Sequence, residues 1–250
     1  NGTLVLEARN ASGAYTSGRV TSSGKFERRY GRFEMRAKLP VGTGLWPAFW
    51  LLPTAGSPTW PQSGEIDIME NRGDQVSTTT GALHYGQLMP NNRNDGTAYT
   101  LTSGNFNDNF HVFAVDWQVG RIDWSVDGVV FKTETAAPAT LNPPSNGAAW
   151  PWDNYNFYIL LNLAVGGPAT AFTGFQNPNF GLAGKYEIDY VRVYDAAQPQ
   201  LTITGRGRVF ENSIKTYSVP AGVNQSYAWT VPVGATITGG QGTTSITVNW

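Results

Sequence analysis

The sequence predicts an all-β fold, because apolar and polar residues alternate in many short runs and glycine, proline or asparagine separates one run from the next. The clearest run is 33–39 (FEMRAKL), in which every second residue is apolar. Such alternation is typical of a strand that buries one face. A chain of 250 residues is long enough for one large β domain, or for a medium domain with a small appendage.

Runs of the same kind are predicted to be strands, in chain order, at 4–8, 33–39, 122–126 and 186–194. Asp127-Gly128 separates the third of these from the apolar run 129–132. Both turn residues tolerate the positive φ of a two-residue turn, so we expect an antiparallel hairpin at this point.

Four aromatic residues of the segment 105–118 also fall at helical spacing: Phe106, Phe110, Phe113 and Trp117. A helix therefore competes with a strand on periodicity alone. We favour a strand because β-branched and aromatic residues dominate 111–117, and because this run leads into the hairpin.

The composition changes after residue 195, where 196–200 (AAQPQ) is typical of a short linker. We therefore predict a large domain over 1–195 and a small one over 201–250. The small domain has a single acidic residue, Glu211, and a Thr/Val/Gly-rich rhythm in which 216–219 and 227–231 are predicted to be strands of a small sandwich.

Composition also excludes several classes of partner. Only 14% of the residues are charged and the net charge is −1, which gives no field strong enough to capture nucleic acid or an anionic membrane. No apolar run approaches the roughly 20 residues of a membrane-spanning helix. The absence of cysteine removes thiolate nucleophiles and cysteine metal sites. We expect neither nucleic acid nor membrane as a partner.

Three carboxylates lie within six residues, Glu65, Asp67 and Glu70, in a run otherwise made of Ile and Met. In a regular strand Glu65 and Asp67 share one face and Glu70 points to the other. A β-bulge at Ile68-Met69 would bring all three to one face. Two carboxyls about 5 to 5.5 Å apart are what a retaining glycosidase needs, and Asp67 would hold a proton between them.

Two other interpretations of the acidic run stay open at this point. The face could simply be a solvated strand face. It could also bind a metal ion, although a strand cannot wrap the six to eight oxygens that Ca²⁺ prefers. The glycosidase interpretation is the one that we favour.

Residues 65–70 (EIDIME) resemble the E-x-D-x-x-E signature of glycoside hydrolase family 16, in the bulged form of laminarinases. Companion stretches agree with that family in order and spacing, at 30–40, 45–52, 110–117, 161–167 and 190–194. The resemblance covers 1–195. It implies a jelly-roll, concanavalin A-like β-sandwich with an open cleft and an endo-1,3-β-glucanase activity that retains anomeric configuration. It also implies that Glu65 is the nucleophile, Glu70 the acid/base and Asp67 the auxiliary carboxylate.

The same resemblance implies three substrate-binding residues in the cleft, Trp46, His84 and Asn162. Trp50 would share the face of Trp46 in a regular strand, and it is equally well explained as a core residue. We also expect 150–152 and the loop after Gly167 to border the cleft.

The resemblance further suggests one structural calcium ion, because Asp189 matches the calcium-binding aspartate of the family. The sequence begins within what looks like the second strand of such domains, so the partners of Asp189 are missing. No cofactor is expected for the chemistry. Residues 201–250 resemble PKD-like, immunoglobulin-type modules, of which the final strand is expected to be missing. We expect a secreted, extracellular monomer whose partner is a laminarin-like β-glucan.

Two alternatives to this activity were weighed. Another bulged member of the family could act on a galactan, as agarases and carrageenases do, but no concentrated set of arginines for sulfated sugars is visible. A non-catalytic glycan-binding sandwich is disfavoured because a lectin has no use for three clustered carboxylates.

Overall fold

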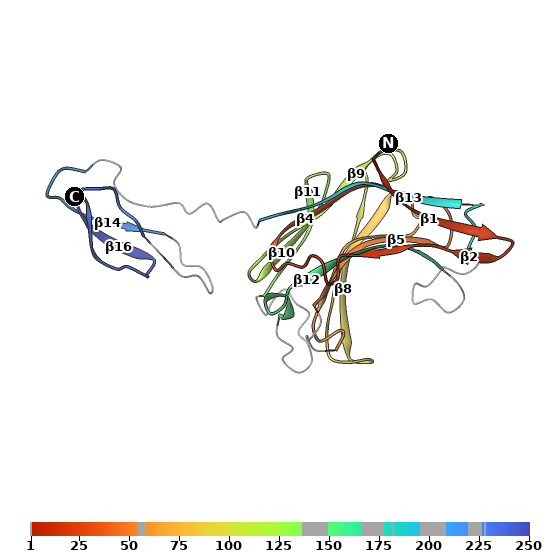
Figure 1. Cartoon of the computed structure of the whole chain (residues 1–250), viewed down its shortest axis with the longest axis horizontal. Coiled ribbons are helices and arrows are strands. Elements are labelled where there is room, and N and C mark those ends of the chain that lie inside the picture. The colour runs from red at the N-terminus through yellow and green to blue at the C-terminus, as the bar shows by residue number, and fades with distance from the viewer. Residues whose placement is uncertain are drawn as a thin grey trace. The chain divides into compact units, whose positions relative to one another are not determined.

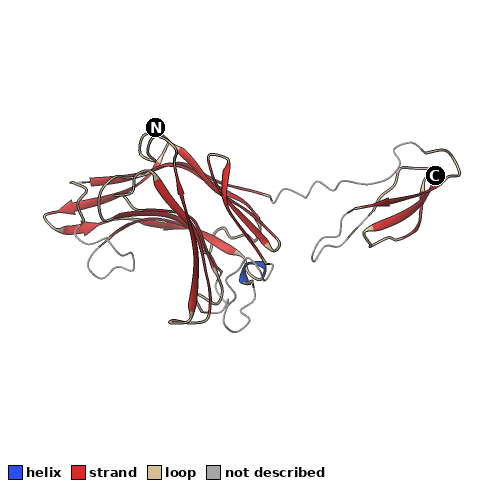
Figure 2. Ribbon diagram, turned by 180° about the vertical axis from the view of Figure 1, so that it is seen from behind, coloured by secondary structure: helices blue, strands red, loops and turns tan. Residues whose placement is uncertain are grey.

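The computed structural model describes residues 2–54, 59–136, 150–166, 178–181, 183–195, 209–219, 227 and 229–250. The chain divides into two compact units, Asn1–Ala196 and Ala197–Trp250, and each is considered by itself. The predicted linker 196–200 lies outside the described residues. Within them, strands dominate both units, and the 3₁₀-helix η1 (Pro151–Asp153) is short, so the all-β prediction is confirmed (Figures 1 and 2). No helix among the described residues is both long and apolar enough to cross a lipid bilayer.

The first unit is a sandwich of two antiparallel sheets (Figure 1). The seven-stranded sheet has the order β11 (Val129–Thr135), β10 (Arg121–Val126), β9 (His111–Gln118), β4 (Gly31–Lys38), β13 (Ala183–Tyr194), β1 (Leu4–Ala11) and β2 (Ala14–Thr16). The six-stranded sheet has the order β3 (Arg19–Thr21), β12 (Phe157–Val165), β5 (Leu45–Pro53), β6 (Glu65–Asn71), β7 (Thr78–Gly86) and β8 (Asn92–Thr100). The acidic run therefore occupies β6, in the interior of the second sheet.

The segment with two interpretations forms a strand, β9, and not a helix. This strand is rich in β-branched and aromatic residues, and it pairs with β4 on one side and with β10 on the other. The predicted hairpin follows directly, and its turn residues Asp127 and Gly128 have φ values of 49° and 82°. Both observations confirm the reasoning from residue type and turn chemistry.

The core lies between the two sheets and is rich in aromatic residues. Phe33 and Phe113 reach it from the seven-stranded sheet, while Phe49, Ile66 and Phe157 reach it from the six-stranded sheet, and all are fully buried. Alternation along each strand sends these side chains inward and leaves the other face of the six-stranded sheet for polar residues.

At one edge of the sandwich, β8 and β11 approach each other around a buried lysine. The Lys132 ammonium donates to Asp95 Oδ1 and to Glu134 Oε1, both at 2.8 Å. It also lies 5.5 Å from the centre of the Trp124 ring. The buried cation is thus paired, as a charge removed from water must be.

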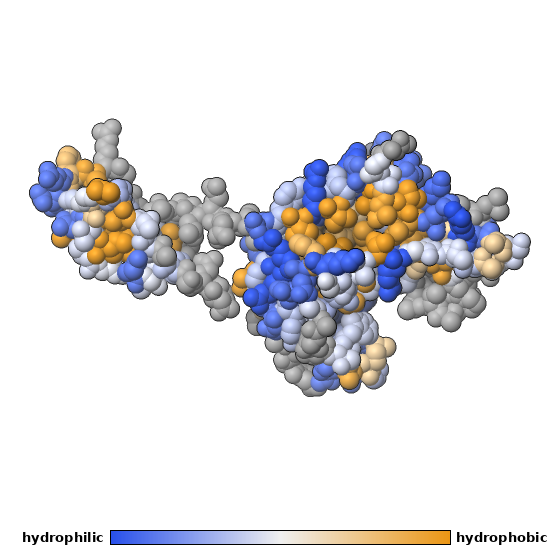
Figure 3. Space-filling model, in the orientation of Figure 1, coloured by the Kyte–Doolittle hydropathy of each residue, from blue (hydrophilic) through white to orange (hydrophobic). Residues whose placement is uncertain are grey.

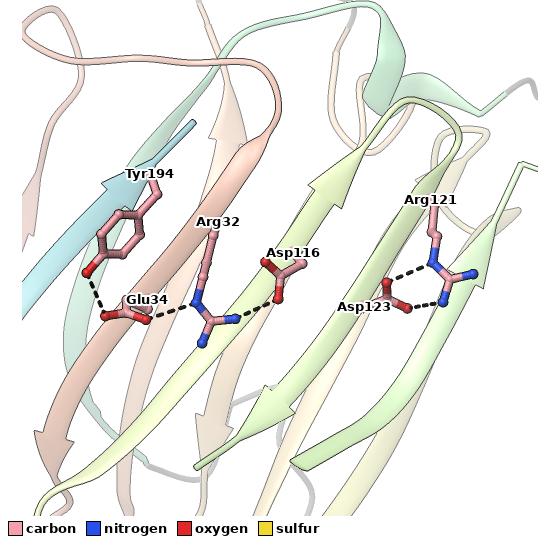
Figure 4. Close-up of polar contacts among 6 residues, drawn as sticks. All are labelled: Arg32, Glu34, Asp116, Arg121, Asp123 and Tyr194. Atoms are coloured by element: carbon pink, nitrogen blue, oxygen red, sulfur yellow. Dashed lines mark hydrogen bonds and ion pairs between the residues drawn. The ribbon is translucent and has the colours of Figure 1, made fainter. Parts of the chain in front are cut away.

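The outer face of the seven-stranded sheet carries paired charges (Figure 4). Arg32 donates to Glu34 at 2.9 Å and to Asp116 at 2.6 Å, and the Tyr194 hydroxyl donates to Glu34 at 3.2 Å. Farther along the sheet, Arg121 donates twice to Asp123. We call these residues the convex ladder, and every carboxylate in it has a guanidinium partner.

The core is less well covered where β1 begins. Leu4 lies on the same side of the strand as Leu6 and Ala8, yet it is 43% exposed while those two are buried. In Figure 3 an apolar area, ringed by hydrophilic residues, spreads over the side of the unit where Figure 1 labels β1 and β13.

The second unit contains one three-stranded sheet in the order β14 (Ile214–Ser218), β16 (Ser245–Asn249) and β15 (Thr236–Gly239). The strand predicted at 216–219 matches β14. The prediction of a strand at 227–231 was wrong for the described residues of this segment, because none of them is in a strand. The backbone N–H and C=O groups of Trp229 bond the side chain of Gln241 and no neighbouring strand.

Candidate active site

The three carboxylates meet because β6 is bulged where the sequence predicts it. On the β7 side, Asp67 pairs with Ala82 but Glu70 pairs with Thr80, so three steps along β6 match two along β7. On the β5 side the register shifts between Phe49 and Trp50. The extra residue reverses the alternation, and Ile68 and Met69 both join the core. Glu70 therefore shares a face with Glu65 and Asp67.

These side chains line a cleft of about 200 Å³ on the face of the six-stranded sheet that points away from the core. We call it the carboxylate cleft, and its walls come from β3, β5, β6 and β12: Arg19, Trp46, Ala48, Trp50, Glu65, Asp67, Glu70, Asn162 and Ala164. A second hollow of about 370 Å³ shares Arg19, Asn162 and Ala164 with it and continues along β12. The cleft thus extends along β12.

Neutral indole groups hold two of the carboxylates. Trp46 Nε1 donates to Glu70 Oε1 at 2.9 Å, and Trp60 Nε1 donates to Glu65 Oε2 at 2.6 Å. A hydrogen bond from a neutral donor orients a carboxylate without cancelling its charge. Trp46 therefore lies in the cleft as expected, and its N–H contacts a carboxylate.

His84 lies across the strand pair from Glu65 in the β6–β7 register. Its Nε2 is 3.0 Å from Asp67 Oδ2, and its ring centre is 6.1 Å from that of Trp60. The structure thus places this histidine, for which the resemblance implies substrate binding, beside the carboxylates. The Asp67 side chain is almost fully buried, and a protonated His84 imidazole would form an ion pair with it.

Burial governs the electrostatics of the site. Desolvation, reinforced by the charge of Asp67, raises the pKa of Glu65 to about 8. Desolvation also raises the pKa of Glu70 to about 7, and the charge of Glu65 adds to that shift. The pKa of Asp67 is raised for the same reason, with Glu70 as the second cause. Near neutral pH the three carboxyls therefore share protons and are not all ionised.

Trp50 and Asn162 form a second pair on the cleft wall. Trp50 Nε1 donates to Asn162 Oδ1 at 2.7 Å, and the Arg19 guanidinium lies 5.5 Å from the centre of the Trp50 ring. The amide oxygen of Asn162 is thus used within the protein. Trp50 lines the cleft and is not a core residue.

The structure does not favour the calcium ligand that the resemblance suggests. Asp189 lies at a register shift of β13, and its Oδ2 accepts from Arg36 Nη1 at 2.6 Å. A guanidinium at this distance competes with a cation for the same oxygen. Among the described residues, the group of three possible ligand atoms lies elsewhere, on Glu65, Asp67 and His84, within 4.8 Å of one another. Calcium at Asp189 stays a prediction from the resemblance.

Sequence reasoning missed three tryptophans that support β6. Trp60 bonds the Glu65 carboxylate, as described above. Trp124 Nε1 donates to the backbone oxygen of Asp67 at 2.8 Å, and Trp152 Nε1 donates to that of Glu65 at 3.3 Å. Only the position of Trp60, five residues before Glu65, could have suggested a contact. The others come from remote segments.

Two of the residues 150–152, which are expected to border the cleft, are buried in the core. Trp150 is almost fully buried and Trp152 is fully buried, and their ring centres are 4.7 Å apart. Trp152 packs against the start of β6, where its Nε1–H donates to the backbone oxygen of Glu65. The loop after Gly167 lies outside the described residues.

Comparisons with known proteins show the family to which the chain belongs. The family model for glycosyl hydrolases family 16 matches residues 1–154, and the model for a PKD-like domain matches 196–250. The glucan endo-1,3-beta-glucosidase A1 of Niallia circulans is 39% identical over 188 residues, which make up 74% of this chain but 27% of that protein. The beta-glucanase of Rhodothermus marinus is 38% identical over 77% of this chain and 68% of its own length.

A solved structure extends the similarity to the fold. The catalytic domain of an endo-1,3-beta-glucanase (laminarinase) from Thermotoga petrophila superposes with a TM-score of 0.68 at 36% identity, covering 79% of each chain. The aligned region is large enough to contain the whole first unit and its cleft.

Proposed function

Because the chain belongs to glycosyl hydrolase family 16, we propose that it is an endo-acting β-1,3-glucanase that cleaves laminarin-type glucans with retention of configuration. The observation that carries the proposal is the β6 bulge, which gathers three buried carboxyls in one open cleft. The names of the relatives from Niallia circulans and Rhodothermus marinus support the choice of substrate.

The reaction would proceed in two displacements. In the first, the Glu65 carboxylate attacks the anomeric carbon while Glu70 gives its proton to the departing glycosidic oxygen, and the bond to that oxygen breaks. In the second, Glu70 takes a proton from water, the water oxygen attacks the anomeric carbon, and the bond to Glu65 breaks. Asp67 would hydrogen-bond Glu65 and buffer the proton of the cluster.

The higher pKa falls on Glu65, although a nucleophile must react as the carboxylate. The two statements are compatible, because the reacting species is the pair of glutamates that holds one proton between them. That proton must be on Glu70 when the sugar is attacked. The Trp60 N–H favours the ionised form of Glu65, as the Trp46 N–H favours that of Glu70, so the proton can move between the two carboxyls.

The wall of the cleft suits a neutral polymer. Trp46 and Trp50 present aromatic rings to the apolar faces of pyranose units, and Asn162 lies between them and the second hollow. All the described residues that line the cleft belong to one chain, so we propose that the protein acts as a monomer. A glucan polymer cannot enter a cell, so the proposal includes secretion.

The decisive experiment compares the wild-type protein with Glu65→Ser and with Glu187→Ser, a control that removes a carboxylate paired with Lys38 on the other sheet. We expect the first variant to lose laminarin hydrolysis by several orders of magnitude while it still binds laminari-oligosaccharides. The control should keep the wild-type rate. If Glu65→Ser keeps it as well, the nucleophile is another residue.

The stereochemistry and the substrate are tested on the wild-type protein. NMR of fresh products should show the β-anomer first, whereas an initial α-anomer would exclude retention. A panel of laminarin, curdlan, mixed-linkage glucan, agarose and carrageenan, with products sized over time, should show mid-chain cleavage of the β-1,3-glucans. Preferential cleavage of a galactan would contradict the proposed substrate.

A further inference from the structure

The β6 bulge takes backbone groups out of register with the neighbouring strands, and these groups need other hydrogen-bond partners. A buried carbonyl without a hydrogen-bond donor is costly, and bulges interrupt the ladder that normally supplies one. At this bulge the donor comes from the opposite sheet. Trp124, on β10, is fully buried and donates its Nε1–H to the backbone oxygen of Asp67 at 2.8 Å.

The strand next to β6 is shaped to admit this indole. Gly81 lies on β7 between Thr80, which pairs with Glu70, and Ala82, which pairs with Asp67, so it faces the bulge. A Cβ atom at position 81 would lie 2.4 Å from Trp124 Cδ1 and 2.9 Å from Nε1. Any larger residue would therefore push the ring away from the Asp67 carbonyl.

A positive charge also lies against the ring. Lys132 Nζ lies 5.5 Å from the centre of the Trp124 ring, a distance at which a cation is attracted to an aromatic face. The lysine is itself immobilised by Asp95 and Glu134. Trp124 therefore has a glycine and a buried cation as close neighbours, and its Nε1–H is directed at the bulge.

We propose that Trp124 is a positioning residue that fixes the β6 bulge and thereby places Glu70 in the carboxylate cleft. The activity measurements that test this inference rest on the proposed function. The role of Trp124 in fixing the bulge rests on the geometry above. Trp124 does not touch the cleft, so it acts through the backbone of β6. Loss of its N–H should disturb Glu70, which follows the bulge, more than Glu65, which precedes it.

The test is Trp124→Phe, which keeps an aromatic ring against Gly81 but removes the donor. Trp117→Phe is the matched control, because Trp117 is equally buried in the same sheet and its indole nitrogen has no hydrogen-bond partner. Each variant is assayed on laminarin and on a 2,4-dinitrophenyl β-laminaribioside, whose leaving group needs no proton from an acid.

We expect Trp124→Phe to lower kcat on laminarin at least tenfold with KM within twofold, and to lower kcat/KM on the aryl glycoside, which reports only the first displacement, less than twofold. Trp117→Phe should treat the two substrates alike. If Trp124→Phe slows both substrates equally, or neither, the proposal is overturned. If that variant is not folded by circular dichroism, Gly81→Ala, which displaces the indole and keeps its N–H, takes its place with the same expected pattern.

A crystal structure of Trp124→Phe separates this inference from the proposed function. The inference expects the β6–β7 register to lose its shift between Asp67 and Glu70, or Glu70 to leave the cleft. An unchanged bulge would overturn it. If the wild-type protein cleaves no glucan, the proposed function fails, and the structure of the variant alone decides the role of Trp124.

Discussion

The carboxylate cleft and the convex ladder hold similar numbers of acidic side chains on the two sheets of one sandwich, but they neutralise them differently. In the ladder, Glu34 is buried and still bonds Arg32, whose other branch bonds Asp116 (Figure 4). In the cleft, Glu65 and Glu70 accept hydrogen bonds from neutral indoles. Among the described residues, neither forms an ion pair with lysine or arginine.

This difference shows that burial alone does not identify a reactive carboxylate. A guanidinium partner favours the ionised form of a carboxyl, and the ionised form has no proton to donate. A neutral donor leaves the carboxyl free to gain and lose its proton in the range of neutral pH, which is what an acid/base group needs. Among the described residues, the reactive carboxyls are thus the buried ones that have no lysine or arginine partner. Substitutions on the two sheets can test this difference.

The largest contrast is expected between Glu70→Gln and Glu34→Gln. The first removes the proposed acid/base, so kcat on laminarin should fall by about 10³- to 10⁴-fold, with a much smaller loss of kcat/KM on a dinitrophenyl glycoside, whose first displacement needs no acid. The second leaves a side chain that can still accept from Arg32, and its activity should stay within about threefold of the wild type. Initial rates on both substrates provide the measurement. Equal losses in the two variants would remove the distinction between cleft and ladder.

Asp67→Asn should lose less activity than Glu70→Gln. Its control in the ladder is Asp123→Asn. Asparagine can still donate to Glu65 but cannot take up or release a proton, so kcat should fall by roughly 10²-fold. Asp123 is fully paired with Arg121 on the other sheet, so its variant should remain active. Full activity of Asp67→Asn would show that the central carboxylate has no part in the proton distribution of the cleft.

The pH dependence of the wild-type enzyme is the third test. Because burial raises the pKa of Glu70 to about 7 and that of Glu65 to about 8, the pair holds one proton mainly between these values. The value of kcat/KM should form a bell with its maximum between about 7 and 8. It should fall about tenfold per pH unit below it, as a second proton binds, and above it, as the last proton leaves. A maximum below pH 5 would mean that the cleft is better solvated than its burial suggests.

The contrast also explains what could be predicted from the sequence. The bulge at Ile68-Met69 was predictable because side chains of a regular strand alternate between its two faces, which would put Glu70 on the apolar face. One inserted residue brings Glu70 back to the face of the other two acids. The hairpin at Asp127-Gly128 was predictable because its turn residues are local. In these cases the signal and the structure lie within a few residues of each other.

Trp124 and Trp152 could not be predicted, since their roles depend on contacts between segments 57 and 87 residues apart. A buried tryptophan in a β protein has many possible neighbours, and periodicity only shows that it faces inward. The segment at 227–231 failed for a related reason. Its composition suits a strand, but the side chain of Gln241 satisfies the backbone of Trp229.

The smallest expected effect is on stability, and here the cleft and the ladder should differ in sign. The folded-state pKa of Glu70, about 7, is above the ordinary value of 4.5. Its contribution to stability is therefore complete below pH 4.5 and is lost as the pH rises through 7. At pH 8 the ionised group costs up to about 3 kcal/mol.

Glu70→Gln should consequently raise the free energy of unfolding by about 1 to 2 kcal/mol at pH 8, and by much less at pH 5. Asp116→Asn removes one partner of a half-exposed ladder pair and should lower it by less than about 1 kcal/mol at either pH. Urea unfolding of both variants at the two pH values measures the difference. A Glu70→Gln variant that is less stable than the wild type at pH 8 would show that the indole of Trp46 stabilises the ionised carboxylate by more than burial destabilises it.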